Sequence, residues 1–170
     1  MRELSNYDQF QDTISISERN VNEQYDMELL LRFIIFSKIE MDSFGKTSDI
    51  GQYLTSKMIE IAKDKKFNAD FSEKQFKAVF NLLSNTTGSN SFKRFNDGKF
   101  KGGFLLSPFE VIACGLGYNY PGNLPSPGKI FKEVERMYSN DEYIKCSGSG
   151  IPARYRLPRL LPLGRKIFSK

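Results

Sequence analysis

The longest apolar run of the chain extends from Gln24 to Ile39, and ten of its sixteen residues are large and apolar. This run is longer than a typical strand, and it is too short and too charged to cross a membrane, so it predicts a helix. Its residues are apolar almost all round. We therefore expect this helix to lie at the centre of the fold, with neighbours packed on several sides.

The few charged residues of this helix predict a structural polar cluster. Glu28 precedes Arg32 by four residues, which is the favourable order for an ion pair on one helix face. An arginine in such an apolar helix needs a partner, because an unpaired buried charge is very costly. We expect Asp26, Glu28 and Arg32 to form this cluster, with a structural role.

Apolar residues recur at helical spacing in several other stretches, and no stretch shows convincing strand alternation. The prediction is an all-α protein with about six helices in one domain over residues 1–170, beginning with a short amphipathic helix within residues 3–16. Capping residues and prolines indicate where the later helices begin. These signals are Ser48 before about Asp49, Ser72 with Gln75, Ser107 with Pro108 and Glu110, Ser126 with Pro127, and Pro158 with Pro162 in the tail.

The residue types that are missing restrict the chemistry. The chain has no histidine, which removes the commonest general base and every Ser-His or Cys-His nucleophile pair. It has two cysteines, Cys114 and Cys146, which are too few for a disulfide scaffold or a zinc site, and we interpret Cys114 as a core thiol. The polar N-terminus has no signal-peptide pattern. We expect a cytoplasmic protein without catalytic residues, metal or cofactor.

Two glycine-containing segments resemble phosphate-binding loops in part. Gly45-Lys46-Thr47 lacks the glycine that a phosphate-binding loop needs five residues earlier, where Glu40 stands, so it predicts a plain turn. The segment from Ser147 to Gly150 alternates serine and glycine and could surround a phosphate with backbone N–H groups. It does not follow a clear strand, and a flexible turn is the alternative.

Positive charge is concentrated at the C-terminal end. The 28 residues from Tyr143 to Lys170 contain seven basic residues and no acidic one, whereas the first 142 contain 18 basic and 20 acidic residues. This asymmetry favours an anionic partner, with nucleic acid the first candidate. The alternative is that the leucines of the tail enter the core and some arginines pair with acids from earlier segments. The candidate nucleic-acid contacts here are Arg154, Arg156, Arg159, Arg165 and Lys166.

A second basic stretch lies between Phe92 and Phe104, around a predicted Asp97-Gly98 turn. It interleaves aromatic rings with cations, as single-strand-binding proteins do when rings stack on bases and cations follow phosphates. The alternative is that the rings anchor a loop in the core while the cations remain solvated. Its candidate nucleic-acid contacts are Lys93, Arg94, Lys99 and Lys101.

Taken in order, several motifs resemble the helical C-terminal half of the ParB-like domain of the GmrSD family, bacterial restriction proteins that act on modified phage DNA. The match covers nearly the whole chain, and each motif in it is loose. The matching residues are Arg19, Asp26-x-Glu28-x-x-x-Arg32-Phe33, Asn90-x-Phe92-x-Arg94, Ser107-Pro108-Phe109-Glu110, Ser149-Gly150, Arg159 and Gly164-Arg165.

The resemblance implies a helical module of a restriction or phage-defence system without its catalytic parts. The family's nucleotide-handling core carries a D-G-Q-Q-R motif upstream, and a His-containing nuclease domain often follows; this chain has neither. The resemblance therefore implies a non-catalytic module that supports a partner bearing the D-G-Q-Q-R motif and contacts DNA. The alternative is a free-standing basic adaptor that binds another protein.

Overall fold

A computed structural model describes residues 1–40 and 49–170. The expected Ser48 cap and the Gly45-Lys46-Thr47 turn lie outside the described residues. The described part is mostly helical, which confirms the predicted fold class. Its elements are α1 (Arg2–Ser5), α2 (Asp8–Ile14), α3 (Glu18–Asn22), α4 (Tyr25–Phe36), α5 (Ile50–Lys63), α6 (Ala69–Thr86), the 3-10 helix η2 (Gly88–Asn90), β1 (Arg94–Asn96), β2 (Lys99–Lys101), α7 (Leu106–Asn119), α8 (Pro127–Met137), α9 (Asp141–Cys146) and α10 (Ala153–Ile167).

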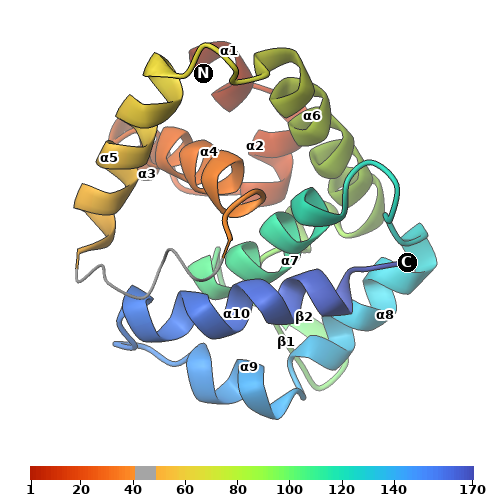
Figure 1. Cartoon of the computed structure of the whole chain (residues 1–170). Helices are drawn as coiled ribbons and strands as arrows, with labels where there is room; N and C mark the ends of the chain where they lie inside the picture. The colour runs from red at the N-terminus through yellow and green to blue at the C-terminus, as the bar shows by residue number, and fades with distance from the viewer. Residues whose placement is uncertain (41–48) are drawn as a thin grey trace.

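Two helices share the centre of the fold. The predicted helix α4 is buried along most of its length, as its apolar pattern requires, and α1, α3, α5, α6 and α7 pack around it. Helix α7 is more buried still, because every residue from Pro108 to Gly117 is buried. Figure 1 shows α4 and α7 inside the molecule, with α10 lying across α7. None of the helices in the described part is long and apolar enough to span a bilayer.

The described residues form ten α-helices where about six were expected. The difference comes from short helices, since the N-terminal stretch divides into separate helices and α9 forms before the glycine-serine segment. The pattern also missed a two-stranded hairpin, β1 with β2. Each strand has three residues, which is too short to show the alternation that marks a strand in sequence.

Two expected capping boxes are wrong, and both for the same reason. Helix α6 begins earlier than expected, at Ala69. Its cap is Asn68, whose side chain accepts a hydrogen bond from the Phe71 amide, so Ser72 and Gln75 lie buried inside the helix. Helix α7 begins after Leu105 without a side-chain cap, and Glu110 points into the core. In both cases tertiary contacts use residues whose spacing is that of a local cap.

Of two other helix starts, one is as predicted and one is earlier than predicted. Ser126 precedes α8 and Pro127 takes its first position, as expected. Helix α10 begins at Ala153, earlier than the tail prolines suggested, and contains both Pro158 and Pro162. The helix nevertheless buries its leucines, which shows that packing against α7 outweighs the hydrogen bonds that the prolines remove.

Glycines allow α7 and α10 to touch backbone to backbone. A Cβ atom added at Gly164 would overlap the Val111 carbonyl oxygen, and one added at Gly115 would lie 2.5 Å from the Gly164 carbonyl oxygen. Real Cβ atoms do not approach backbone so closely, so neither position accepts a side chain without moving a helix. No sequence spacing indicates this contact, because the two glycines are far apart in the chain.

We expect Gly164→Ala to destabilise the protein by about 3 kcal/mol, because it forces the two helices apart in a close-packed core. The matched control is Gly128→Ala, in the first turn of α8, where an added Cβ meets nothing within 4 Å and alanine is the better helix former. Chemical denaturation of both variants checks this. Equal stability of the two variants would contradict the close approach of α7 and α10.

Candidate anion-binding face

The hairpin separates its side chains by chemistry onto two faces. Arg94 pairs with Lys101 and Asn96 with Lys99, while Phe95 pairs with Phe100 between them. Directly opposite residues of an antiparallel pair lie on the same face, and successive residues alternate. One face therefore carries three exposed cations, and the other carries two partly buried rings.

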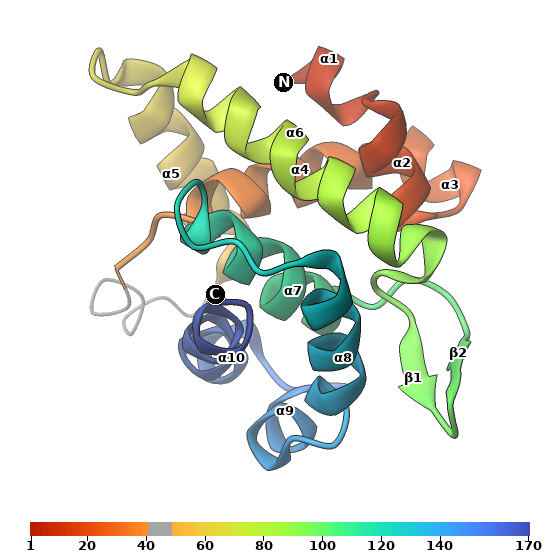
Figure 2. The same cartoon turned by 90° about the vertical axis from the view of Figure 1, so that its right-hand side faces the viewer.

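The turn and the rings hold the hairpin in place. Asp97 and Gly98 both have positive φ, at 51° and 72°, as a two-residue hairpin turn that matches the strand twist requires. The Phe95 and Phe100 rings lie 5.0 Å apart, and Phe100 reaches Phe131 of α8 at 6.3 Å. Figure 2 shows the hairpin extending from the helices on the side of α8. The rings thus pack against one another and α8, which is the alternative that the sequence left open, and the cations lie opposite them.

Beside the hairpin is a groove of about 680 Å³. Its walls come from β1, from the start of α7 at Leu105 to Pro108, from Tyr138 and Tyr143, and from the segment Ser147–Gly150. Arg94 lies on the hairpin side and Arg156 on the α10 side. The structure therefore brings together the hairpin, the start of α7, the region from Tyr138 to Gly150 and α10, and with them the glycine-serine segment and two of the predicted basic contacts, Arg94 and Arg156.

Under the groove is a buried ion-pair network that joins three helices. Glu110 of α7 is 0% exposed, and its two oxygens accept from Nε and Nη2 of Arg156 at 2.7 and 2.8 Å. Arg32 of α4 lies 3.6 Å from the same carboxylate and pairs with Glu28 at 2.7 Å. Burial raises the pKa of Glu110, and the pair with Arg156 opposes this. Two arginines and two glutamates thus balance in charge.

The predicted cluster of Asp26, Glu28 and Arg32 is divided by this arrangement. Glu28 and Arg32 pair as expected, whereas Asp26 accepts a hydrogen bond from Gln11 of α2 at 3.2 Å. The residue that completes the network, Glu110, was interpreted from sequence as a helix cap. Its partner Arg156 is 46 residues away, so no local pattern could have joined them.

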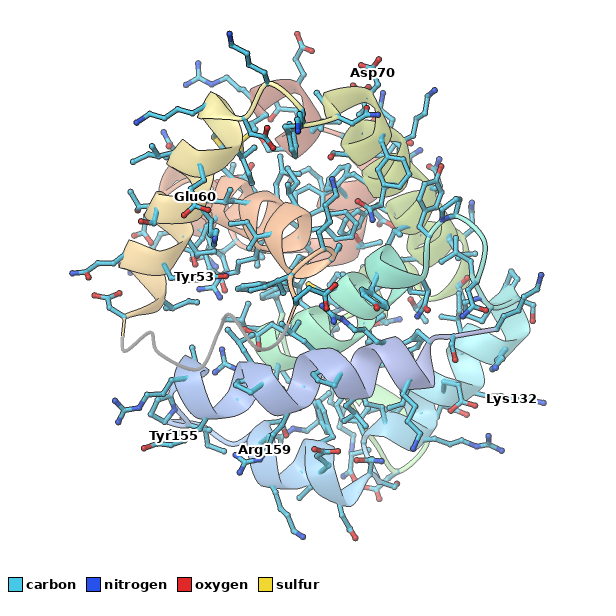
Figure 3. All side chains as sticks on the ribbon, viewed as in Figure 1. Tyr53, Glu60, Asp70, Lys132, Tyr155 and Arg159 are labelled. Atoms are coloured by element: carbon cyan, nitrogen blue, oxygen red, sulfur yellow. The ribbon has the colours of Figure 1, made fainter. Side chains whose placement is uncertain are left out.

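The tail cations are in several different environments. Arg156 belongs to the buried network, and Arg165 lies 4.0 Å over the Tyr118 ring and donates to the carbonyls of Phe36 and Ile39. Arg159, shown in Figure 3 on the side of α10 nearest α9, shares a hollow with Asp141 and Glu142. The sequence had left open that some tail arginines pair with acids from earlier segments, and Arg156 does so with Glu110. Arg154 and Lys166 remain exposed to solvent.

The hairpin cations have fewer partners. Lys93 donates to the side chain of Asn90 at 3.3 Å, and Lys101 lies 3.6 Å from Asp97, which is itself exposed. Among the described residues, no carboxylate lies within ion-pair distance of Arg94 or Lys99. Arg94 and Lys99 are therefore available to an external anion, as are Arg154 and Lys166 of the tail.

Both cysteines of the chain are buried. Burial raises the pKa of the Cys114 thiol well above its usual range, in agreement with a core thiol. Within residues 1–40 and 49–170, no three His, Cys, Asp or Glu side chains gather closely enough to hold a metal ion. Comparisons of the chain with protein-family models, with curated proteins and with solved structures found no match. The GmrSD resemblance stays a prediction.

We expect Arg156→Met to lower the free energy of unfolding by about 3–5 kcal/mol, because it leaves the buried Glu110 carboxylate without its bidentate partner. The double variant Glu110→Met with Arg156→Met should recover most of this loss, since it removes both buried charges. Arg94→Met, on the opposite side of the same groove but exposed, should change stability by no more than about 0.5 kcal/mol. Urea denaturation measures all three. A tolerated Arg156→Met would mean that the network is not closed to water.

Proposed function

We propose that this protein is a non-catalytic binding module that contacts the phosphate backbone of nucleic acid through the exposed face of its hairpin. The observation that carries the proposal is the pairing of Arg94 with Lys101, with Lys99 on the same face. Like charges placed directly opposite one another destabilise a strand pair, and an anion across them removes the repulsion. Phosphates at regular spacing are anions of this kind.

A purely structural role for the hairpin cations explains their presence but not their positions opposite one another. Charged residues on exposed strands prevent edge-to-edge aggregation, which is a reason to have lysine on a hairpin. It does not require cations on both strands at one register position, since a cation opposite an acid would protect the edge equally well and stabilise the pair. Cations directly opposite one another destabilise the strand pair and concentrate positive charge on one face. We therefore interpret this arrangement as a binding feature.

The hairpin face offers phosphate contacts without any base-reading element. Its side chains are long and flexible, and the rings that could stack on bases lie on the opposite face. We therefore expect sequence-tolerant binding to duplex DNA with a dissociation constant on the order of micromolar or weaker at physiological salt. Affinity should fall with salt at a log–log slope near −0.9 for each phosphate neutralised.

The test is the charge reversal Lys99→Glu with Lys101→Glu. It should abolish duplex binding and flatten the salt dependence, while the melting temperature rises or stays constant, because the new carboxylate at position 101 would face Arg94 across the hairpin. The matched control, Lys65→Glu with Lys66→Glu, makes the same charge change at exposed positions after α5 and should retain binding. Fluorescence anisotropy over a salt series measures both.

Equal loss of binding in the two variants would show that only net charge matters, and the hairpin would then have no special role. Absence of salt-dependent binding by the parent protein at low ionic strength would remove the proposal altogether.

Binding to another protein is the second candidate function, and α5 is the observation in its favour. Met58 and Ile59 on this helix are 42% and 45% exposed, and an apolar hollow formed with Leu31, Ile34 and Phe67 lies beside Met58. Figure 1 shows α5 at the edge of the molecule. The family resemblance supplies a candidate partner, a ParB-like protein with the D-G-Q-Q-R motif.

Co-expression with such a protein, where one is encoded next to this chain, tests the second candidate. The two should purify together, and Met58→Glu with Ile59→Glu should separate them while leaving the melting temperature unchanged, because both side chains already face water. The hairpin variant serves as the control and should still purify with the partner. Loss of the complex in both variants would contradict an α5 interface.

A further inference from the structure

The groove beside the hairpin has the size of a small-ligand site. Its volume of about 680 Å³ lies within the range of about 300–1,000 Å³ that is usual for ligand pockets. Of the described residues that line it, none is acidic. The buried carboxylate of Glu110 pairs with the lining residue Arg156 and does not itself line the groove. The groove therefore accepts an anion without repulsion.

The two arginines of the groove differ in what they can offer. Arg156 uses Nε and Nη2 on Glu110 and Nη1 on the Ile151 carbonyl, so three of its five N–H groups are used within the fold. Arg94 is exposed, and no carboxylate in the described part of the chain pairs with it. Arg156 thus supports the floor of the groove, whereas the Arg94 guanidinium is available for a bidentate hydrogen bond to a phosphate.

Neutral donors surround the same space. Ser107 and Ser149 line the groove, as do Gly148 and Gly150, which have only backbone groups to offer. Helix α7 begins beside it, after the lining residue Leu105, and has no side-chain cap. First-turn amides without a side-chain acceptor add donors for an anion. Burial raises the pKa of the Tyr143 phenol, also in the lining, to about 12.

The other part of the groove is apolar. Leu105 and Ile144 are 36% and 54% exposed, and the half-buried Phe95 ring lies between the two exposed neighbours on its strand. Apolar side chains left in contact with water beside a cluster of anion donors suit a ligand with two parts: a phosphate and a flat apolar ring. A ligand of inorganic phosphate alone would leave this apolar wall unused.

We propose that this groove binds a single nucleotide, with its phosphate on Arg94 and the donors of residues 107 and 147–150, and its base against the apolar wall. The nucleotide can be free in solution or one unit of a bound strand. The strand source rests on the proposed nucleic-acid function, whereas the free source does not.

The direct test is calorimetric titration with adenosine 5′-monophosphate at low ionic strength. Binding should be at least tenfold tighter than that of adenosine or inorganic phosphate, because only the nucleotide uses both parts of the groove. Arg94→Met should weaken binding about tenfold, which corresponds to the loss of one charge-assisted contact. The matched control Lys132→Met removes one exposed positive charge from α8, outside both the groove lining and the hairpin, and should bind as the parent does.

Ile144→Glu provides a second variant at an exposed position, where it places a negative charge on the apolar rim, and it should also weaken binding at least tenfold. No heat of binding by the parent up to about 10 mM nucleotide would overturn the proposal. Equal affinity in the parent, Arg94→Met and Ile144→Glu would overturn it as well, because binding would then occur elsewhere.

Competition separates the two sources. If the nucleotide displaces a labelled single strand at the concentration that fills the groove, the groove holds one unit of the strand. If strand binding is unchanged at saturating nucleotide, the groove holds a free nucleotide. A parent protein that binds nucleotide but no strand contradicts the proposed function alone, and one that binds strand but no nucleotide contradicts the groove alone.

Discussion

The buried carboxylate of Glu110 is the interaction on which the rest of the structure depends. It receives Arg156 from α10 and faces Arg32 from α4, so one side chain joins the three helices that form the interior. A charge in this position is costly unless every partner is in place, which couples the placement of the helices to one another. The network also holds one wall of the groove in place, because Arg156 both pairs with Glu110 and lines the groove.

The parts of this arrangement that sequence could predict are local ones. The apolar run of α4, the Glu28–Arg32 pair at four-residue spacing and the Asp97-Gly98 turn all depend on neighbours along the chain, and the structure has all three. Glu110 could not be assigned correctly, because a glutamate three residues after a serine is also the signature of a cap. Which signature applies depends on an arginine 46 residues later.

In the candidate site, too, only the local features could be predicted from the sequence. Sequence found the basic stretch around Arg94 and the glycine-serine segment at 147–150, and left both open between a binding role and a structural one. It could not tell that they share one groove, since that depends on how α9 and the hairpin lie against α7. The count of basic residues also overstated how many tail cations are available to a partner, because Arg156 and Arg165 form hydrogen bonds within the fold.

The cover that α10 provides for α7 has a consequence for biosynthesis. Helix α7 is complete at Asn119, yet the helix that shields it ends at Ile167, 48 residues later. At translation rates of about 5–20 residues per second, synthesis of α10 is complete roughly 2–10 s after that of α7. During that interval the surface of α7 that α10 covers in the folded protein is without this partner. The interior therefore closes in the order of synthesis, with the C-terminal helix completing it.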